Sequence, residues 1–154
     1  MKSSNNGFNE KTEYRKPEAM PYGSVLVVDD NLTDVHIMVE ILKLFELKAD
    51  SANSGLDAIR KVYDGNKYNV IIMDHIMPDL DGIETTRCLR YMGYNLPIVA
   101  FTACTISGQG SIFLANGFDD FVSKPVDIKK ITCILNKYVR DKELPDVNKE
   151  AKKT

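Results

Sequence analysis

Short apolar runs alternate along the chain with longer segments in which apolar residues recur every three or four positions. The short runs are typical of strands buried on both faces, and the longer segments are typical of amphipathic helices. We expect strands at 25–28, 48–52, 70–73, 98–101 and 121–122. We expect helices at 32–46, from Ser54 to about Gly65, at 82–92, at 107–116 and at 128–138. This alternation predicts a doubly wound α/β fold with a five-stranded parallel sheet and five helices.

The two ends of the chain depart from this pattern. Residues 1–23 are polar, include Pro17 and Pro21, and lack regular apolar spacing, which is typical of a flexible lead-in or linker. Residues 140–154 are mostly charged and indicate a polar tail. Because 154 residues suffice for one ordinary core, a single domain is expected over 24–139.

The composition narrows the classes of partner. A formal net charge of −2 gives no basic surface suited to nucleic acid, and no apolar stretch is long enough to insert into a membrane. The three cysteines, Cys88, Cys104 and Cys133, are widely spaced and lack the spacing of a zinc site or a disulfide framework. We therefore expect a cytoplasmic protein whose partner is another protein or a small ion.

Polar residues follow several of the expected strands. Asp29 and Asp30 come directly after the first strand, Asp74 after the third, Thr102 after the fourth and Lys124 after the fifth. In an open parallel sheet, functional groups gather outside the carboxyl ends of the strands. Clustered carboxylates repel one another unless a hard cation such as Mg²⁺ binds them, and a carboxylate beside that cation is able to attack phosphorus.

The motifs at these strand ends resemble those of a response-regulator receiver domain. They are Val27-Val28-Asp29-Asp30-Asn31, Met73-Asp74-His75-Ile76-Met77-Pro78, Asp81-Gly82, Phe101-Thr102-Ala103 and Lys124-Pro125, and the likeness covers 24–138. The resemblance implies a flavodoxin-like fold with strand order 2-1-3-4-5. It also implies a Mg²⁺ (or Mn²⁺) cofactor and a role as a signalling switch rather than an enzyme.

The resemblance assigns roles at the phosphoryl site. Asp74 would be the phosphoacceptor, Asp30 a direct metal ligand, Asp29 a metal-site acid acting through water, and the Ile76 backbone carbonyl a further ligand. Lys124, joined to Pro125 by a cis peptide bond, would contact the phosphoryl group.

The resemblance also implies a switch. The Thr102 hydroxyl would move to meet the phosphoryl group, and Phe121 would occupy the switch-aromatic position without the hydroxyl of a tyrosine. Ile76 and Cys104 lie where the family tunes the lifetime of the acyl phosphate. Because neither side chain readily orients water, we expect slow self-dephosphorylation.

The first expected helix carries a wide apolar arc that needs a cover. Ile37, Ile41 and Leu44 lie on a flank beside its core stripe. The resemblance favours docking of a histidine kinase or a histidine-phosphotransfer bundle there. The alternative is that the N-terminal segment folds back over this arc through its apolar residues, which are Phe8, Tyr14, Met20 and Tyr22.

Other functions and contexts compete with this interpretation. An aspartyl-phosphate phosphatase of the haloacid-dehalogenase type would carry its nucleophile after the first strand in a DxD arrangement, whereas Asp29-Asp30-Asn31 stands there. A pseudo-receiver that only binds partners is the third possibility, although every site carboxylate and Lys124 are present. Within the receiver family, a stand-alone regulator and a receiver of a hybrid kinase both stay open.

Overall fold

The computed structural model describes residues 17–103 and 109–142. Within these ranges, five strands alternate with five α-helices. The strands are β1 (Ser24–Val28), β2 (Lys48–Ala52), β3 (Val70–Asp74), β4 (Ile98–Thr102) and β5 (Asp120–Ser123). The helices are α2 (Leu32–Lys43), α3 (Gly55–Tyr63), α4 (Gly82–Tyr91), α5 (Gln109–Ala115) and α6 (Ile128–Leu135), which continues into a π-helical turn, η1 (Asn136–Arg140).

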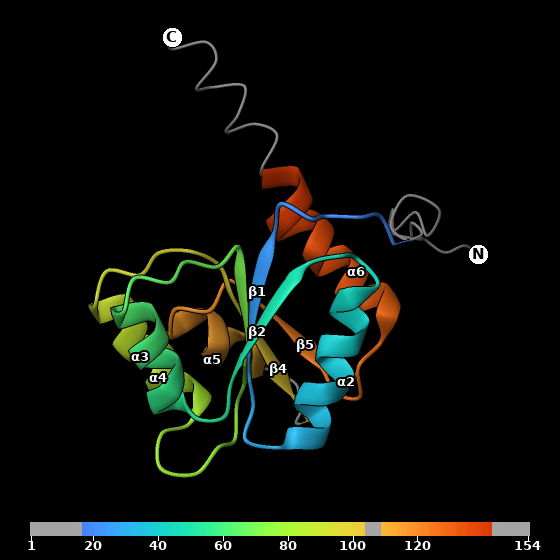
Figure 1. The fold of residues 1–154 in the computed structure, drawn as a ribbon. Helices are drawn as coiled ribbons and strands as arrows, with labels where there is room; N and C mark the ends of the chain where they lie inside the picture. The colour runs from blue at the N-terminus through green and yellow to red at the C-terminus, as the bar shows by residue number, and fades with distance from the viewer. Residues whose placement is uncertain (1–16, 104–108, 143–154) are drawn as a thin grey trace, which may run out of the picture.

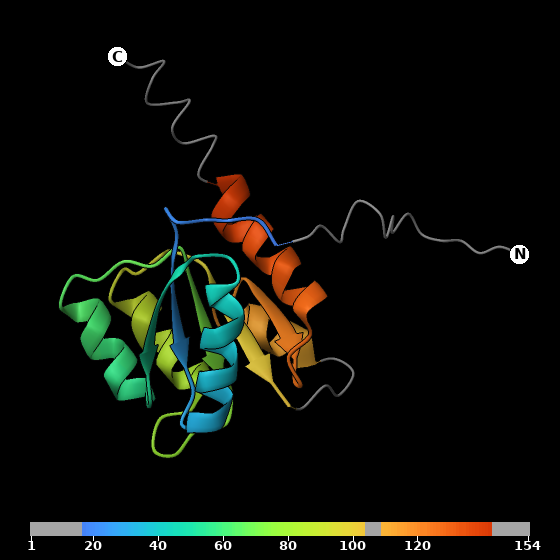
Figure 2. The same cartoon turned by 45° about the vertical axis from the view of Figure 1, so that its right-hand side comes forward.

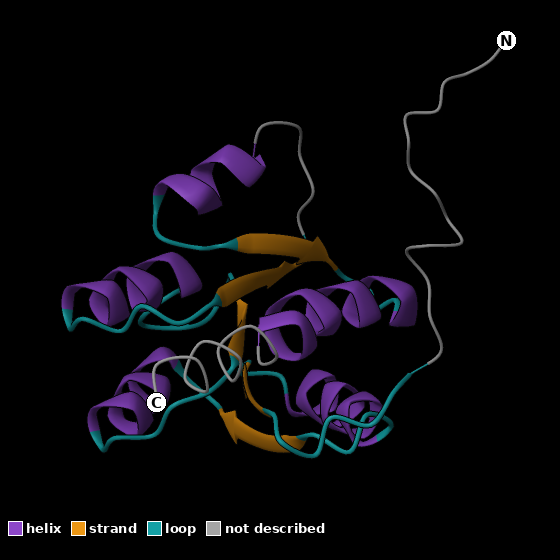
Figure 3. Cartoon of the chain, turned by 90° about the horizontal axis from the view of Figure 1, so that it is seen from above, coloured by secondary structure: helices purple, strands orange, loops and turns teal. Residues whose placement is uncertain are grey.

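All strand pairs are parallel, and the strand order is β2-β1-β3-β4-β5. The central strands β3 and β4 are buried along their whole length, as their unbroken apolar runs predict. Helices α2 and α6 cover one face of the sheet, and α3, α4 and α5 cover the other, which is clearest in the view from above (Figures 1 and 3). The predicted fold class and strand order are confirmed.

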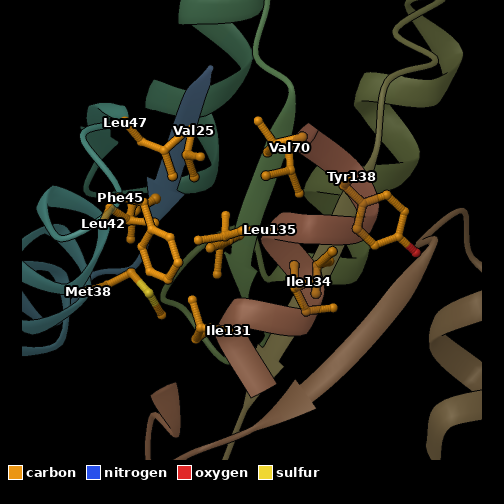
Figure 4. Close-up of a cluster of buried hydrophobic side chains, with 14 of the residues drawn as sticks. Val25, Met38, Leu42, Phe45, Leu47, Val70, Ile131, Ile134, Leu135 and Tyr138 are labelled. Carbon is orange, nitrogen blue, oxygen red and sulfur yellow. The ribbon is translucent and has the colours of Figure 1, made fainter. Parts of the chain in front are cut away.

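Two hydrophobic clusters fill the layers between the sheet and its helices. On the α2 and α6 side, Met38, Leu42 and Phe45 meet Leu135 beneath the first and third strands (Figure 4). On the opposite side, Phe113 is almost fully buried among residues of α3, α4 and the central strands. Burying both faces fixes the strand register, and with it the place where each strand ends.

Several helix boundaries differ from the sequence prediction, and the end of α2 and the start of α5 are two examples. Helix α2 ends at Lys43 rather than at 46, because the chain turns through Leu44 and Phe45 to Glu46, whose φ of 56° lies in the left-handed region. Helix α5 begins at Gln109, and the two residues before it in the expected helix lie outside the described residues.

Ordered packing begins before the expected boundary at residue 24. The Met20 side chain is fully buried in the α2–α6 cluster, and its backbone N–H donates a 2.6 Å hydrogen bond to the Phe45 carbonyl. Beside it, Glu18 pairs with Arg140 at 2.6 Å, where the N-terminal segment passes the end of the last helix (Figure 2). The lead-in predicted over 1–23 and the tail predicted from 140 therefore each contribute residues to the folded domain. Among the described residues, none of the helices meets the length and apolarity that crossing a bilayer requires.

Candidate phosphoryl-transfer site

The ends of β1, β3, β4 and β5 bring the predicted site residues to one edge of the sheet. Asp74 is the last residue of β3 and Thr102 the last of β4, while Asp29 follows β1 and Lys124 follows β5. Strand pairing sets them side by side: Asp74 lies opposite Phe101, and the Lys124 N–H donates a 2.8 Å hydrogen bond to the Thr102 carbonyl. Sheet register alone thus gathers groups that are far apart in the sequence.

Three carboxylates form the acidic part of this edge. Asp29, Asp30 and Asp74 each offer an oxygen atom, and these oxygens lie within 4.8 Å of one another. Asp29 and Asp74 are buried, whereas Asp30 is exposed. A set of oxygen ligands with one open side fits Mg²⁺, which takes carboxylate oxygens and usually retains several waters. The carbonyl of Ile76 stays a predicted ligand.

Lys124 lies among the carboxylates. Its Nζ donates hydrogen bonds to Asp29 Oδ2 and Asp34 Oδ2, both at 3.0 Å, and lies 3.3 Å from Asp74 Oδ1. Burial by itself lowers the Lys124 pKa, but hydrogen bonds to Asp34 and Asp29 and the charge of Asp74 outweigh it, so the pKa is raised. The ammonium is therefore charged at neutral pH, and the Lys124–Pro125 peptide bond is cis, as the resemblance implied.

The environment of Asp74 works against its ionisation. The pKa of the Asp74 carboxyl is raised to about 6, because burial and the nearby Asp29 carboxylate raise it by more than Lys124 lowers it. Asp74 Oδ1 also accepts a 2.9 Å hydrogen bond from the His75 backbone N–H. A cation bound between Asp74 and Asp29 would favour the anion, which is the form able to attack phosphorus.

Asp34 is the one member of this site that the sequence reasoning missed. Its N–H donates a 3.0 Å hydrogen bond to the Asn31 side chain at the N-cap of α2, which is an ordinary role for a residue at a helix start. Its carboxylate nevertheless contacts Lys124. Its position in the sequence could have indicated this role, because a residue in the first turn of the helix after β1 lies at the carboxyl edge of the sheet.

The predicted switch residues differ in exposure. Thr102 is buried, with 3% of its surface exposed, whereas Phe121 is 44% exposed. The Phe121 ring packs so closely on Gly110 that a Cβ there would overlap it, and its centroid lies 6.3 Å from that of Phe113. The Phe121 ring therefore packs on α5 with one side exposed to solvent. Of the two positions predicted to tune the acyl-phosphate lifetime, Ile76 is exposed and Cys104 lies outside the described residues.

The apolar arc on α2 is narrower than predicted. Ile37 and Leu44 are exposed, at 42% and 57%, but Ile41 is partly buried against the α2–α6 cluster. Ile41 therefore borders the core, whereas Ile37 and Leu44 stand on the exposed flank. Met20 supports the alternative cover only in part, because it packs under Phe45, while Phe8 and Tyr14 lie outside the described residues.

A groove beside Lys124 adjoins the exposed part of α2. Its volume is about 340 Å³, and it runs between α2 and the segment that follows β5. The residues that line it are Asp34, Ile37, Met38, Phe101, Ala103, Lys124, Pro125 and Val126. The charged site and an apolar surface are therefore continuous.

Comparisons with known proteins point to one family. The family model of the response regulator receiver domain matches residues 25–136. Two-component response regulator 24 of Arabidopsis thaliana is 34% identical over 114 residues, covering 74% of this chain and 82% of the relative. Hybrid signal transduction histidine kinase L of Dictyostelium discoideum is 39% identical over 124 residues, covering 75% of this chain.

The length that this chain spans differs greatly among these relatives. It covers only 7% of the length of the Dictyostelium kinase. Two-component system protein A of Emericella nidulans is 34% identical over 120 residues, which cover 77% of this chain but only 18% of that relative. Similarity is therefore confined to one segment of these larger proteins.

Solved structures share the fold. A Francisella response regulator receiver domain superposes with a TM-score of 0.72 at 27% identity, covering 78% of this chain and 98% of that one. The receiver domain of a Pseudomonas aeruginosa sensor histidine kinase, solved with magnesium coordinated in its active-site cleft, superposes with a TM-score of 0.68 at 28% identity. The match covers 76% of this chain and 97% of that one. With its family-model match, fold and carboxylate–lysine site, this chain belongs to the response regulator receiver domain family.

Proposed function

We propose that this domain accepts a phosphoryl group on Asp74 from a phosphohistidine donor in the presence of Mg²⁺, and that the resulting acyl phosphate changes its surface. The observation that carries the proposal is the position of the Lys124 ammonium, which lies 3.3 Å from Asp74 Oδ1. It lies beside the three carboxylates whose oxygens are close enough together to bind one metal ion. The role is that of a cytoplasmic signalling switch.

In the transfer step, an Asp74 oxygen attacks phosphorus. The bond from phosphorus to the donor imidazole nitrogen breaks, and its electron pair stays on the imidazole. Mg²⁺ held by Asp29, Asp30, Asp74 and the Ile76 carbonyl would offset negative charge on the phosphoryl oxygens. Lys124 contributes a second positive charge, positioned before the donor arrives.

The switch follows from the new group on Asp74. The Thr102 hydroxyl, at the end of the neighbouring strand, would hydrogen-bond a phosphoryl oxygen, and Phe121 would rotate inward from its half-exposed position. Phosphorylation biases a conformation only through contacts that are better in that conformation, and Thr102 and Lys124 are the groups placed to make them. Because neither Ile76 nor Cys104 readily orients water, the acyl phosphate should persist well beyond seconds.

The donor is proposed to dock on α2. Exposed Ile37 and Leu44, with Ile41 at their inner edge, flank the groove that leads to Lys124. A helix of a histidine kinase or a histidine-phosphotransfer protein, presenting its phosphohistidine beside apolar side chains, fits such a surface. Whether the domain acts alone or within a hybrid kinase depends on chain context, and the relatives include both kinds of protein.

Incubation with acetyl phosphate and Mg²⁺, followed by intact-mass measurement, tests the proposal. The protein should gain one phosphoryl group, which is lost in Asp74→Asn and retained in Asp79→Asn, a matched control on the exposed loop after β3 whose asparagine tolerates the left-handed backbone there. A phosphatase would instead release phosphate over many turnovers, and a pure interaction module would show neither result. Failure of the wild-type protein to gain a phosphoryl group would refute the proposed function.

A further inference from the structure

We propose that Asp34 is a positioning residue that competes with the incoming phosphoryl group for Lys124, so that its carboxylate restrains phosphorylation of Asp74. This inference rests on the proposed function. It concerns a residue outside the predicted metal and phosphoryl ligands, which acts through the lysine rather than on the phosphoryl group.

The first support is the geometry of the ammonium group. Lys124 has three N–H donors, and it donates hydrogen bonds to Asp29 and Asp34 at 3.0 Å each, while Asp74 is its most distant carboxylate at 3.3 Å. In the resting protein, the lysine is therefore held most closely by its two neighbours. The third donor faces Asp74 at the longest distance, so the ammonium must move away from one of its two nearer partners to approach a phosphoryl group on Asp74 closely.

Exposure decides which carboxylate releases the lysine. The Asp29 side chain is 3% exposed, so removing its lysine contact would leave a buried, poorly solvated charge. The Asp34 side chain is 35% exposed and borders the groove beside Lys124. Water can replace the ammonium at Asp34 but not readily at Asp29, so Asp34 is the contact that gives way.

The backbone of α2 keeps this competitor in place. Asp34 lies in the first turn of the helix, where the Asn31 side chain accepts a hydrogen bond from its N–H. The carboxylate is thus carried on a capped helix rather than on a loop, and its reach toward Lys124 is fixed. A side chain of the same shape without the charge would keep the helix and weaken the hold on the lysine.

The consequence concerns the barrier to phosphoryl transfer. When an Asp74 oxygen bonds to the phosphorus of acetyl phosphate, the phosphorus–oxygen bond to acetate breaks and acetate leaves with the electron pair. Lys124 approaches the phosphoryl oxygens, where negative charge develops, more closely once it leaves Asp34. An interaction stronger in the ground state than in the transition state slows a reaction, so weakening it should accelerate transfer.

The test is the rate of acetyl phosphate labelling in Asp34→Asn. We expect the rate to rise by about three- to tenfold, the size expected for losing one partly exposed, charge-assisted hydrogen bond. Asp57→Asn is a matched control, because Asp57 occupies the equivalent first-turn position of α3, with its N–H donated to the Ser54 cap. Thermal stability should be similar in both variants.

A second control separates local competition from general repulsion of the anionic donor. Asp79→Asn removes the same charge from an exposed position after β3 and should leave the rate within about twofold of wild type, since exposed charges are well screened. The Asp34→Asn acceleration should also persist at high ionic strength.

Each other outcome would overturn the inference. An unchanged or slower rate in Asp34→Asn would mean that Asp34 does not restrain Lys124. Equal acceleration in Asp79→Asn, or loss of the effect in high salt, would mean that charge alone is responsible. If wild-type protein takes up no phosphoryl group, the proposed function fails together with this inference; if only the variant comparison fails, the proposed function stands.

Discussion

The α-carbon of Gly82 packs directly against the backbone carbonyl of Asp74, and a Cβ at that position would overlap the carbonyl oxygen. The Gly82 N–H also donates a 2.7 Å hydrogen bond to the His75 carbonyl. The start of α4 is thereby fixed against the end of β3. The glycine of the Asp81-Gly82 pair after β3 thus has a structural reason, because only glycine allows this approach.

Gly82→Ala should therefore destabilise the fold and disturb the site. We expect a loss of about 2–4 kcal/mol in the free energy of unfolding, because the clash involves backbone atoms that cannot rotate away. Urea denaturation measures this loss. Labelling with acetyl phosphate should fall as well, since the Asp74 backbone must shift.

Gly65→Ala is the matched control for this substitution. Gly65 has a φ of 101° but open space around it, so alanine there meets only backbone strain, worth about 1 kcal/mol. Labelling should stay normal. Equal losses of stability in the two variants would contradict the argument from close packing.

The raised pKa of Asp74 predicts that ionising this group opposes folding. Its folded pKa of about 6 exceeds the ordinary value of 3.8, so the folded state binds the proton more tightly than the unfolded chain does. The resulting stabilisation is fully present below pH 4 and is lost as the pH rises through 6. Asp74→Asn, which carries no such charge, should be more stable than the wild-type protein at pH 7.5 without metal, by about 1–3 kcal/mol.

The measurement is urea denaturation of both proteins in chelator at pH 5 and pH 7.5. The difference in stability between Asp74→Asn and wild type should grow with pH. A difference that stays constant between the two pH values would show that Asp74 ionises normally in the folded protein.

The residues that sequence reasoning located and those it missed differ in the kind of contact they make. Asp29, Asp74 and Lys124 could be placed because each ends a strand, and parallel strand ends meet at one edge whatever the details of packing. Asp34 could not, because its contact depends on the direction of one side chain relative to a lysine 90 residues away in the sequence. The sequence indicates Met20 only as one possible cover of the first helix, because its packing under Phe45 depends on the path of the whole segment. The rotation of α2 that half-buries Ile41 likewise depends on core packing rather than periodicity.

The carboxylate cluster predicts stabilisation by Mg²⁺. Asp29, Asp30 and Asp74 repel one another in the metal-free protein, and a cation that binds only the folded state shifts the unfolding equilibrium. Saturating Mg²⁺ should add about 1–3 kcal/mol at neutral pH, read from urea denaturation. Asp30→Asn should weaken Mg²⁺ binding by roughly tenfold or more.

Asp79→Asn provides the comparison for Asp30→Asn, because it removes an equal charge from an exposed aspartate outside the three-carboxylate cluster. Its Mg²⁺ affinity, measured by titration calorimetry, should stay close to that of wild type. If both variants lose affinity equally, the metal responds to net charge and not to a defined site.

Met20 predicts that the folded domain begins before residue 24. Its side chain is fully buried with Phe45 and Leu47, so Met20→Ala should leave a cavity and lower the free energy of unfolding by about 2–4 kcal/mol. Glu18→Gln, which removes only the ion pair between the exposed Glu18 side chain and Arg140, should change it by less than about 1 kcal/mol. A chain starting at Ser24 should lose at least as much stability as Met20→Ala in urea denaturation. Wild-type stability in that shortened chain would show that the preceding segment is a true linker, because burial of Met20 would then contribute nothing to the fold.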